Sequence, residues 1–296
     1  MSAQTTPAEP ESGVHTPKPS LPEIVRVVIA AVLMIAMNIV PLLLLAIPPV
    51  AAAARDRSNV ALAGTLQLGS MALVLVSALL LLWIVARTVD RVRLRDYGIE
   101  WNRRSLPGLL IGLGVSLVVV VGAYAALTAL GLTREAPGDL TSQPLWQIVL
   151  GVFFLAFVLQ GIPEEFIWRG YLLTTLQAKG LVRAVWISAA VFGVMHLISQ
   201  GGQENLLERF LYLLWPFGFA VAAGALRLTT GSLWAAVGIH AGSHVAGATA
   251  QGLGLSTGGP ASWIVMGALY TAVGVWALSR YRRRGTSDPQ LAHAPA

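Results

Sequence analysis

The chain has 296 residues, of which 55% are hydrophobic and only 11% are charged, whereas a soluble domain carries about 25% charged residues. The composition therefore excludes an ordinary soluble protein, and the absence of cysteine excludes disulfides and thiolate metal sites. The net charge of +6 does not indicate nucleic-acid binding, because the arginines cluster between apolar runs and no aromatic RNA-binding motif accompanies them.

The first 22 residues are polar and rich in Pro, Ser and Thr, which predicts a disordered N-terminal tail. The apolar run 27–50 follows, and residues 51–54 resemble a signal-peptidase site. Because the run is longer than the apolar region of a typical signal peptide, we favour a retained first span. Residues 281–296 are predicted to form a basic, polar C-terminal tail, which leaves 23–280 as the transmembrane domain.

Seven further apolar runs each approach or exceed the roughly 20 residues that cross a bilayer. They are 61–86, 106–130, 145–178, 181–199, 207–226, 231–251 and 261–279. The predicted fold is all-α, a polytopic transmembrane bundle of about eight spans. The run 145–178 is either one long helix kinked near Gly161 and Pro163 or a span followed by a second apolar helix.

Basic residues alternate between the loops. Six arginines lie between the second and third runs, and the C-terminal tail opens with four more in residues 280–284, whereas the alternate loops hold few. Basic loops stay on the cytoplasmic side. We therefore expect both termini in the cytoplasm and an even number of spans.

Three charges interrupt the run 145–178, at Glu164, Glu165 and Arg169. An ionised side chain at the bilayer centre costs roughly 2.5–3.5 kcal/mol on insertion scales, so such residues are expected to pair or to act. On a helix, Glu165 and Arg169 share a face and can form an ion pair, which could be purely structural. Glu164 points about 100° away, so it is a candidate general base in an apolar cleft.

Three histidines also fall within apolar runs. Gly180 is the predicted turn between two spans, with Glu164 sixteen residues before it and His196 sixteen after it. In an antiparallel hairpin these two residues lie at equal depth. His240 and His244 share one face of a later helix that is rich in Ala, Gly and Ser. Ionisable clusters inside a membrane are functional by default.

Together the motifs E-E-x-x-x-R (Glu164, Glu165, Arg169), F-x-x-x-H (Phe192, His196) and the later His240 resemble a known signature. It is that of the CAAX-protease and bacteriocin-processing (CPBP, or Abi) family of intramembrane proteases, and the resemblance covers about residues 145–250. It implies that Glu164 activates a water and that His196 holds or polarises it. It further implies that His240 and His244 stabilise the oxyanion, while Glu165 and Arg169 support the first carboxylate.

The resemblance implies an integral protein of a bacterial plasma membrane that cleaves a membrane-anchored or lipophilic peptide. One position departs from the pattern, because the family usually has Asn where this chain has His244. The change makes His196, His240 and His244 a candidate three-histidine zinc set. No H-E-x-x-H motif is present in the sequence, and we favour chemistry without a metal cofactor.

Two other functions remain open at the level of sequence. A catalytically silent immunity or scaffold protein would keep the fold without turnover, and His244 favours this alternative. A proton-coupled transporter could use the Glu and His residues as a relay. No internal inverted repeat is apparent in the sequence, which disfavours the transporter.

Overall fold

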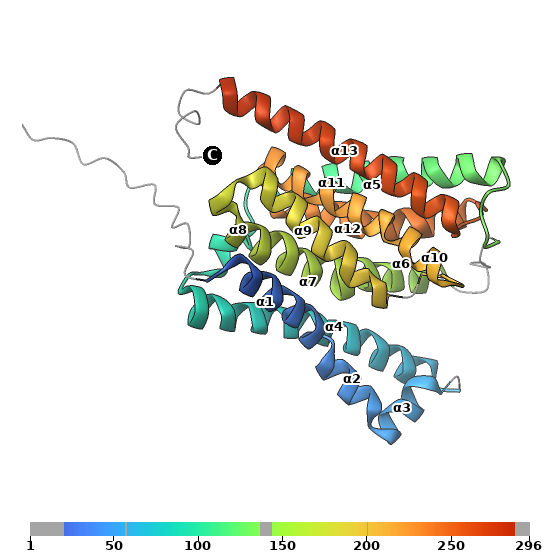
Figure 1. Cartoon of the computed structure of the whole chain (residues 1–296). Coiled ribbons are helices and arrows are strands. Elements are labelled where there is room, and N and C mark those ends of the chain that lie inside the picture. The colour runs from blue at the N-terminus through green and yellow to red at the C-terminus, as the bar shows by residue number, and fades with distance from the viewer. Residues whose placement is uncertain (1–20, 57, 137–143, 200, 288–296) are drawn as a thin grey trace, which may run out of the picture.

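The computed structural model of the chain describes residues 21–56, 58–136, 144–199 and 201–287, with the last four of these by backbone alone. Within these ranges the regular structure is helical, and strand pairing is limited to one bridge between Glu135 and Thr257. The helices lie side by side in one bundle (Figure 1). The predicted all-α class is therefore confirmed, whereas nearly all of the predicted N-terminal tail lies outside the described residues.

The first apolar run forms three helices, of which the first two together make one segment long enough to span a membrane, Glu23–Ala46. They are α1 (Glu23–Ala36), α2 (Ile39–Ala46) and α3 (Pro48–Arg55). Pro48 opens α3, and the backbone of Ile47 before it is extended, with ψ at 118°. Proline disfavours the helical conformation in the residue that precedes it, so the run breaks there. Both short helices, α2 and α3, pack against α4 (Val60–Val85).

A buried polar cluster ties α1 to the rest of the bundle. The guanidinium of Arg26 pairs with the carboxylate of Asp90 and lies 3.4 Å from the hydroxyl of Tyr171. The hydroxyl of Tyr97 also donates to Asp90, and burial raises the pKa of Tyr97 well above its usual value. These contacts hold α1 in place within the bundle.

Beyond α4 the chain continues through further α-helices. They are α5 (Ser105–Ala129), α9 (Leu181–Met195), α10 (Leu206–Tyr212), α11 (Leu214–Thr230), α12 (Leu233–Gly252) and α13 (Pro260–Ser287). Between α5 and α9 lies one long helical segment, Leu145–Lys179. The predicted C-terminal tail was expected to begin at residue 281, but α13 continues as far as Ser287.

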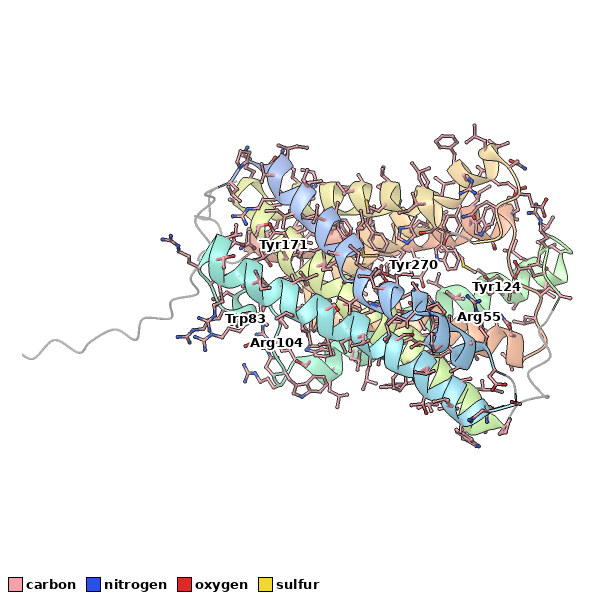
Figure 2. All side chains as sticks on the ribbon, turned by 90° about the horizontal axis from the view of Figure 1, so that it is seen from below. Arg55, Trp83, Arg104, Tyr124, Tyr171 and Tyr270 are labelled. Carbon is pink, nitrogen blue, oxygen red and sulfur yellow. The ribbon has the colours of Figure 1, made fainter. Side chains whose placement is uncertain are left out.

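Seven helical segments among the described residues are long and apolar enough to cross a membrane. They are Glu23–Ala46, Val60–Asp90, Ser105–Ala129, Leu145–Lys179, Leu181–Ile198, Leu206–Thr230 and Pro260–Arg283. The remaining expected span forms α12, which is not among the seven because two histidines and many small residues lower its hydropathy. The outside of the bundle is apolar: Trp83 is 48% exposed, whereas Tyr270 is fully enclosed (Figure 2). These features define an integral membrane protein.

Helix α12 occupies the centre of the bundle through very close contact with α5. A Cβ added at Gly238 would lie 2.2 Å from the carbonyl oxygen of Leu109, and one at Gly112 would lie 2.3 Å from that of Ala235. Glycine at these positions lets the two backbones touch, as small residues do in membrane helix pairs. The small residues of α12 thus allow close packing against α5, and this packing fixes the position of His240.

Helix α1 begins and α13 ends at the same end of the bundle (Figure 1). The turn before α9 lies at Gly180, whose φ of 110° favours glycine, as predicted.

Candidate active site

The charged motif lies on a distorted part of the Leu145–Lys179 segment. Two π-helical stretches, Phe154–Gly161 and Phe166–Leu172, flank the single α-helical turn α7 (Ile162–Glu165). The segment is thus one continuous helix with local changes in winding, which answers the question left open by the sequence. Wide turns of this kind are rare in helices and occur frequently at functional sites. Here they bracket the turn that carries Glu164 and Glu165.

Gly161 lets this turn approach α12. A Cβ at Gly161 would lie 2.4 Å from the carbonyl oxygen of Ala156 and 3.3 Å from the backbone nitrogen of Ala241. The absence of a side chain at Gly161 therefore removes a clash inside its own helix and allows close contact with α12. As a result, the carboxylates of α7 face the histidine of α12.

Glu165 is the centre of a buried ionic network. Its Oε1 atom accepts a hydrogen bond from Nη1 of Arg169 at 2.9 Å and lies 2.8 Å from Nδ1 of His240. Glu165 and Arg169 are both fully buried, and the guanidinium of Arg169 also lies over the ring of Phe192, 4.6 Å from its centroid. The predicted pair between Glu165 and Arg169 is therefore present, and His240 also contacts Glu165.

The protonation of His240 follows from its partner. A carboxylate can only accept, so Nδ1 of His240 carries the hydrogen. This leaves Nε2 of His240 as an acceptor in the neutral ring and as a donor in the imidazolium. Glu165 thus sets the orientation of the His240 ring, whereas the resemblance had implied that Glu165 supports Glu164.

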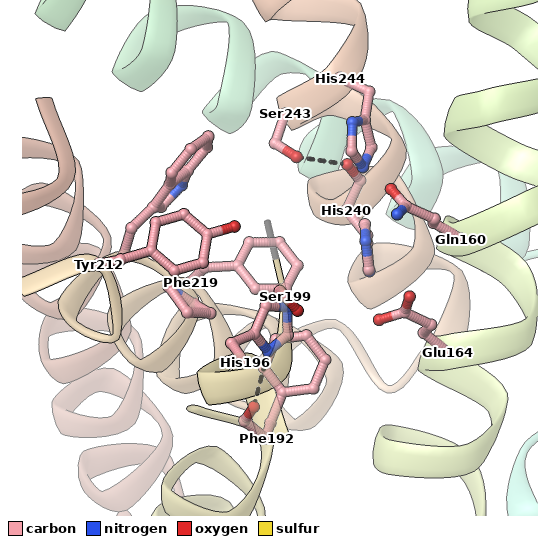
Figure 3. A pocket seen from close by; sticks show the side chains of 12 residues that line it. Gln160, Glu164, Phe192, His196, Ser199, Tyr212, Phe219, His240, Ser243 and His244 are labelled. Atoms are coloured by element: carbon pink, nitrogen blue, oxygen red, sulfur yellow. Dashed lines mark hydrogen bonds between the residues drawn. The ribbon is translucent and has the colours of Figure 1, made fainter. Parts of the chain in front are cut away.

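Glu164 lines a separate space, a cavity of about 300 Å³ between α7, α9, α11 and α12 (Figure 3). The residues that line it are Gln160, Glu164, Phe192, His196, Ser199, Tyr212, Trp215, Pro216, Phe219, His240, Ser243 and His244. Glu165 does not line this cavity, so the two adjacent carboxylates meet different surroundings, as the helix geometry predicts. The Oε2 atom of Glu164 is buried and has no hydrogen-bond partner in the described part of the chain.

His196 reaches the same cavity from the end of α9. Its Nδ1 atom donates to the carbonyl oxygen of Phe192 at 2.8 Å, which leaves Nε2 as an acceptor. Glu164 and His196 therefore meet across the hairpin that turns at Gly180, at the depth that their equal spacing predicts. Phe192 lies against Trp168 and Phe219 and also lines the cavity.

His244 also lines the cavity and stacks on His240, with ring centroids 5.6 Å apart and ring planes 23° apart. Nδ1 of His240 is engaged by Glu165, which leaves Nε2 of His240 free to face the cavity. Across the described residues, no three His, Cys, Asp or Glu side chains are placed to hold a metal ion. The arrangement therefore gives no support to the three-histidine zinc set, which stays a prediction.

Sequence reasoning missed several polar groups in the cavity, namely Gln160, Ser199, Tyr212 and Ser243. Gln160 could have been found, because it is polar, lies in an apolar run and precedes Glu164 by four residues. Tyr212 could not, since an aromatic residue in a span is usually a packing residue. In the structure it faces His196, with ring centroids 6.4 Å apart.

The fold and the cavity define a polytopic membrane protein with carboxylate, imidazole and amide groups gathered inside the bundle. Residues 145–246 match the family model of the type II CAAX prenyl endopeptidase Rce1-like proteins. This match covers the segment that carries the motifs, and it confirms the resemblance drawn from them. A comparison with curated proteins found no significant match to the chain.

Proposed function

We propose that the protein is an intramembrane endopeptidase in which Glu164 is the general base for an attacking water. The observation that carries the proposal is the position of Glu164. Its buried Oε2 atom has no partner among the described residues, and it shares a cavity with the imidazoles of His196, His240 and His244. The segment that holds all of these residues is the one that matches a family of membrane proteases.

The hydrogen-bond roles of the residues give the water a definite orientation. The carboxylate of Glu164 and Nε2 of His196 both accept, so they take the two hydrogens of one water. The oxygen lone pair of that water then faces the carbonyl carbon of the bound peptide. Glu164 removes a proton as the oxygen–carbon bond forms, and the same proton passes to the leaving nitrogen when the carbon–nitrogen bond breaks.

Negative charge that develops on the carbonyl oxygen needs donors. An N–H of His244 donates to this oxygen in the proposal, and so does Nε2 of His240 once that ring is protonated. The carboxylate of Glu165 stabilises the imidazolium through Nδ1, at 2.8 Å. No step of the mechanism is routed through a metal, since no three candidate ligand side chains among the described residues are placed to hold one.

The location of the cavity bears on the substrate and the membrane orientation. A cavity inside a membrane bundle favours a membrane-anchored or lipophilic peptide that enters between helices. The arginine-rich loop after α4 and the end of α13 are the basic parts of the chain. By the tendency of basic loops to stay inside, both ends of the domain face the cytoplasm, and the setting is a bacterial plasma membrane.

The test compares the termini of membrane peptides in cells that express wild type, Glu164→Gln or the control Glu204→Gln at equal levels. Glu204 is a suitable control because its side chain is 67% exposed and lies outside the cavity. We expect new termini with wild type and Glu204→Gln but none with Glu164→Gln. Identical termini in all three cultures, with every protein inserted, would instead support the scaffold or immunity alternative.

A further inference from the structure

The cavity contains a second group whose hydrogen-bonding capacity is unused. Gln160 is near the end of the π-helical stretch before α7, and its Oε1 atom is buried without a partner. No hydrogen bond links its side-chain amide to any residue that the structure describes. Buried polar groups are nearly always paired, so an amide left free at a cavity wall indicates a ligand that pairs with it.

Gln160 and Glu164 lie about one turn apart on the same segment, and both point toward His240 (Figure 3). Neighbours at this helical spacing have Cβ atoms about 5–6 Å apart. An extended peptide advances about 3.3–3.6 Å per residue. A peptide whose scissile bond lies beside Glu164 therefore presents its next or second-next peptide group to Gln160.

The chemistry of the amide matches a peptide group. Gln160 donates through Nε2 and accepts through Oε1, which complements the C=O and N–H of a backbone. A substrate that enters a cavity within the bilayer loses the water that hydrogen-bonded its backbone, and each unsatisfied group costs several kcal/mol there. An uncharged amide satisfies both groups without placing another charge beside Glu164.

We propose that Gln160 is a substrate-positioning residue that pairs with a backbone peptide group one or two residues from the bond that is cleaved. This inference rests on the proposed function and deepens it. Gln160 selects for an extended backbone rather than for a particular side chain. It holds the peptide so that the scissile carbonyl faces the water on Glu164.

The test uses purified protein in lipid nanodiscs and N-palmitoylated peptides of randomised sequence as the probe. The best-cleaved peptide is also made as a series of esters in which one backbone N–H at a time is replaced by oxygen. Rates are measured for wild type, Gln160→Met and the control Gln177→Met. Gln177 lies on the same long segment but outside the cavity.

We expect Gln160→Met to lower kcat/KM by about tenfold, the value of one or two net hydrogen bonds, mainly through KM. Wild type should cleave one ester about as slowly as Gln160→Met cleaves the amide peptide. Gln160→Met should cleave that ester and the amide peptide at the same rate. Gln177→Met should behave as wild type. This pattern reports a direct contact, because a structural defect would slow all peptides alike.

The positioning role would be overturned if every ester slowed cleavage by the same factor in Gln160→Met as in wild type. Full activity of Gln160→Met on the amide peptide would also overturn it. Glu164→Gln is measured alongside to separate the two proposals. If wild type cleaves no peptide, or Glu164→Gln cleaves as fast as wild type, the proposed function fails and the role of Gln160 fails with it.

Discussion

Glu165 lies 2.8 Å from Nδ1 of His240, across 75 residues of sequence, and joins the motif helix to the central helix α12. The same carboxylate oxygen accepts from Arg169 at 2.9 Å. The second glutamate of the motif is therefore an organising residue: it orients a histidine of the cavity, while the first glutamate is left free to face that cavity. This division of roles between adjacent carboxylates underlies the predictions that follow.

The first prediction concerns the buried pair of Glu165 and Arg169. Glu165→Met leaves the buried guanidinium of Arg169 without a carboxylate, and Arg169→Met leaves Glu165 with His240 but without the guanidinium; breaking a buried pair in this way costs about 3–5 kcal/mol of folding stability. The double variant removes both charges and should recover most of this loss. It should remain inactive because His240 has lost its acceptor. Thermal unfolding of the purified variants checks the stability, and equal unfolding temperatures for wild type and both single variants would contradict the prediction.

The second prediction concerns the crossing of α5 and α12. Gly238→Ala places a Cβ 2.2 Å from the carbonyl oxygen of Leu109, so the helices must separate. Overpacking of this kind costs about 1–3 kcal/mol and should also displace His240. Gly247→Ala on the same helix meets nothing within 4 Å and should stabilise slightly. Unfolding temperatures of the two variants decide the matter, and an equal effect of both would refute the close contact.

The third prediction concerns His244. Asparagine at this position also offers an N–H donor, so His244→Asn should keep activity within about threefold of wild type, whereas His244→Leu should lower kcat about 10²–10³-fold. The measurement is kcat on one membrane-anchored peptide. If leucine were tolerated as well as asparagine, position 244 would have no part in stabilising the oxyanion.

The fourth prediction concerns metal dependence. No three candidate ligand side chains among the described residues are placed to hold a metal ion, so exhaustive treatment with a chelator should leave the cleavage rate within about twofold. Metal content is measured on the same samples. A rate that is lost on chelation and restored by added Zn²⁺ would show that these histidines rearrange to bind zinc.

Much of this arrangement could be predicted from the sequence because hydropathy and helical spacing determine it directly. The all-α bundle follows from the apolar runs. The meeting of Glu164 and His196 follows from their equal distance to Gly180.

Other features depend on contacts that no local pattern reports. The contact of Glu165 with His240 requires the approach of two segments far apart in the chain, which Gly161 permits. The π-helical stretches arise from a change in backbone pairing that leaves the hydropathy of the run unchanged. The break of the first run at Ile47 had a signal in Pro48, but length alone suggested one span.

The most direct test of the central claim is a single-turnover measurement on wild type and Glu164→Gln in nanodiscs with one membrane-anchored peptide. Unfolding temperatures of both proteins serve as the control for folding. Glu164→Gln keeps the size of the side chain and removes the base, so we predict a loss of at least about 10²-fold in the cleavage rate with normal folding. A Glu164→Gln protein that cleaves at the wild-type rate would show that Glu164 does not activate the water.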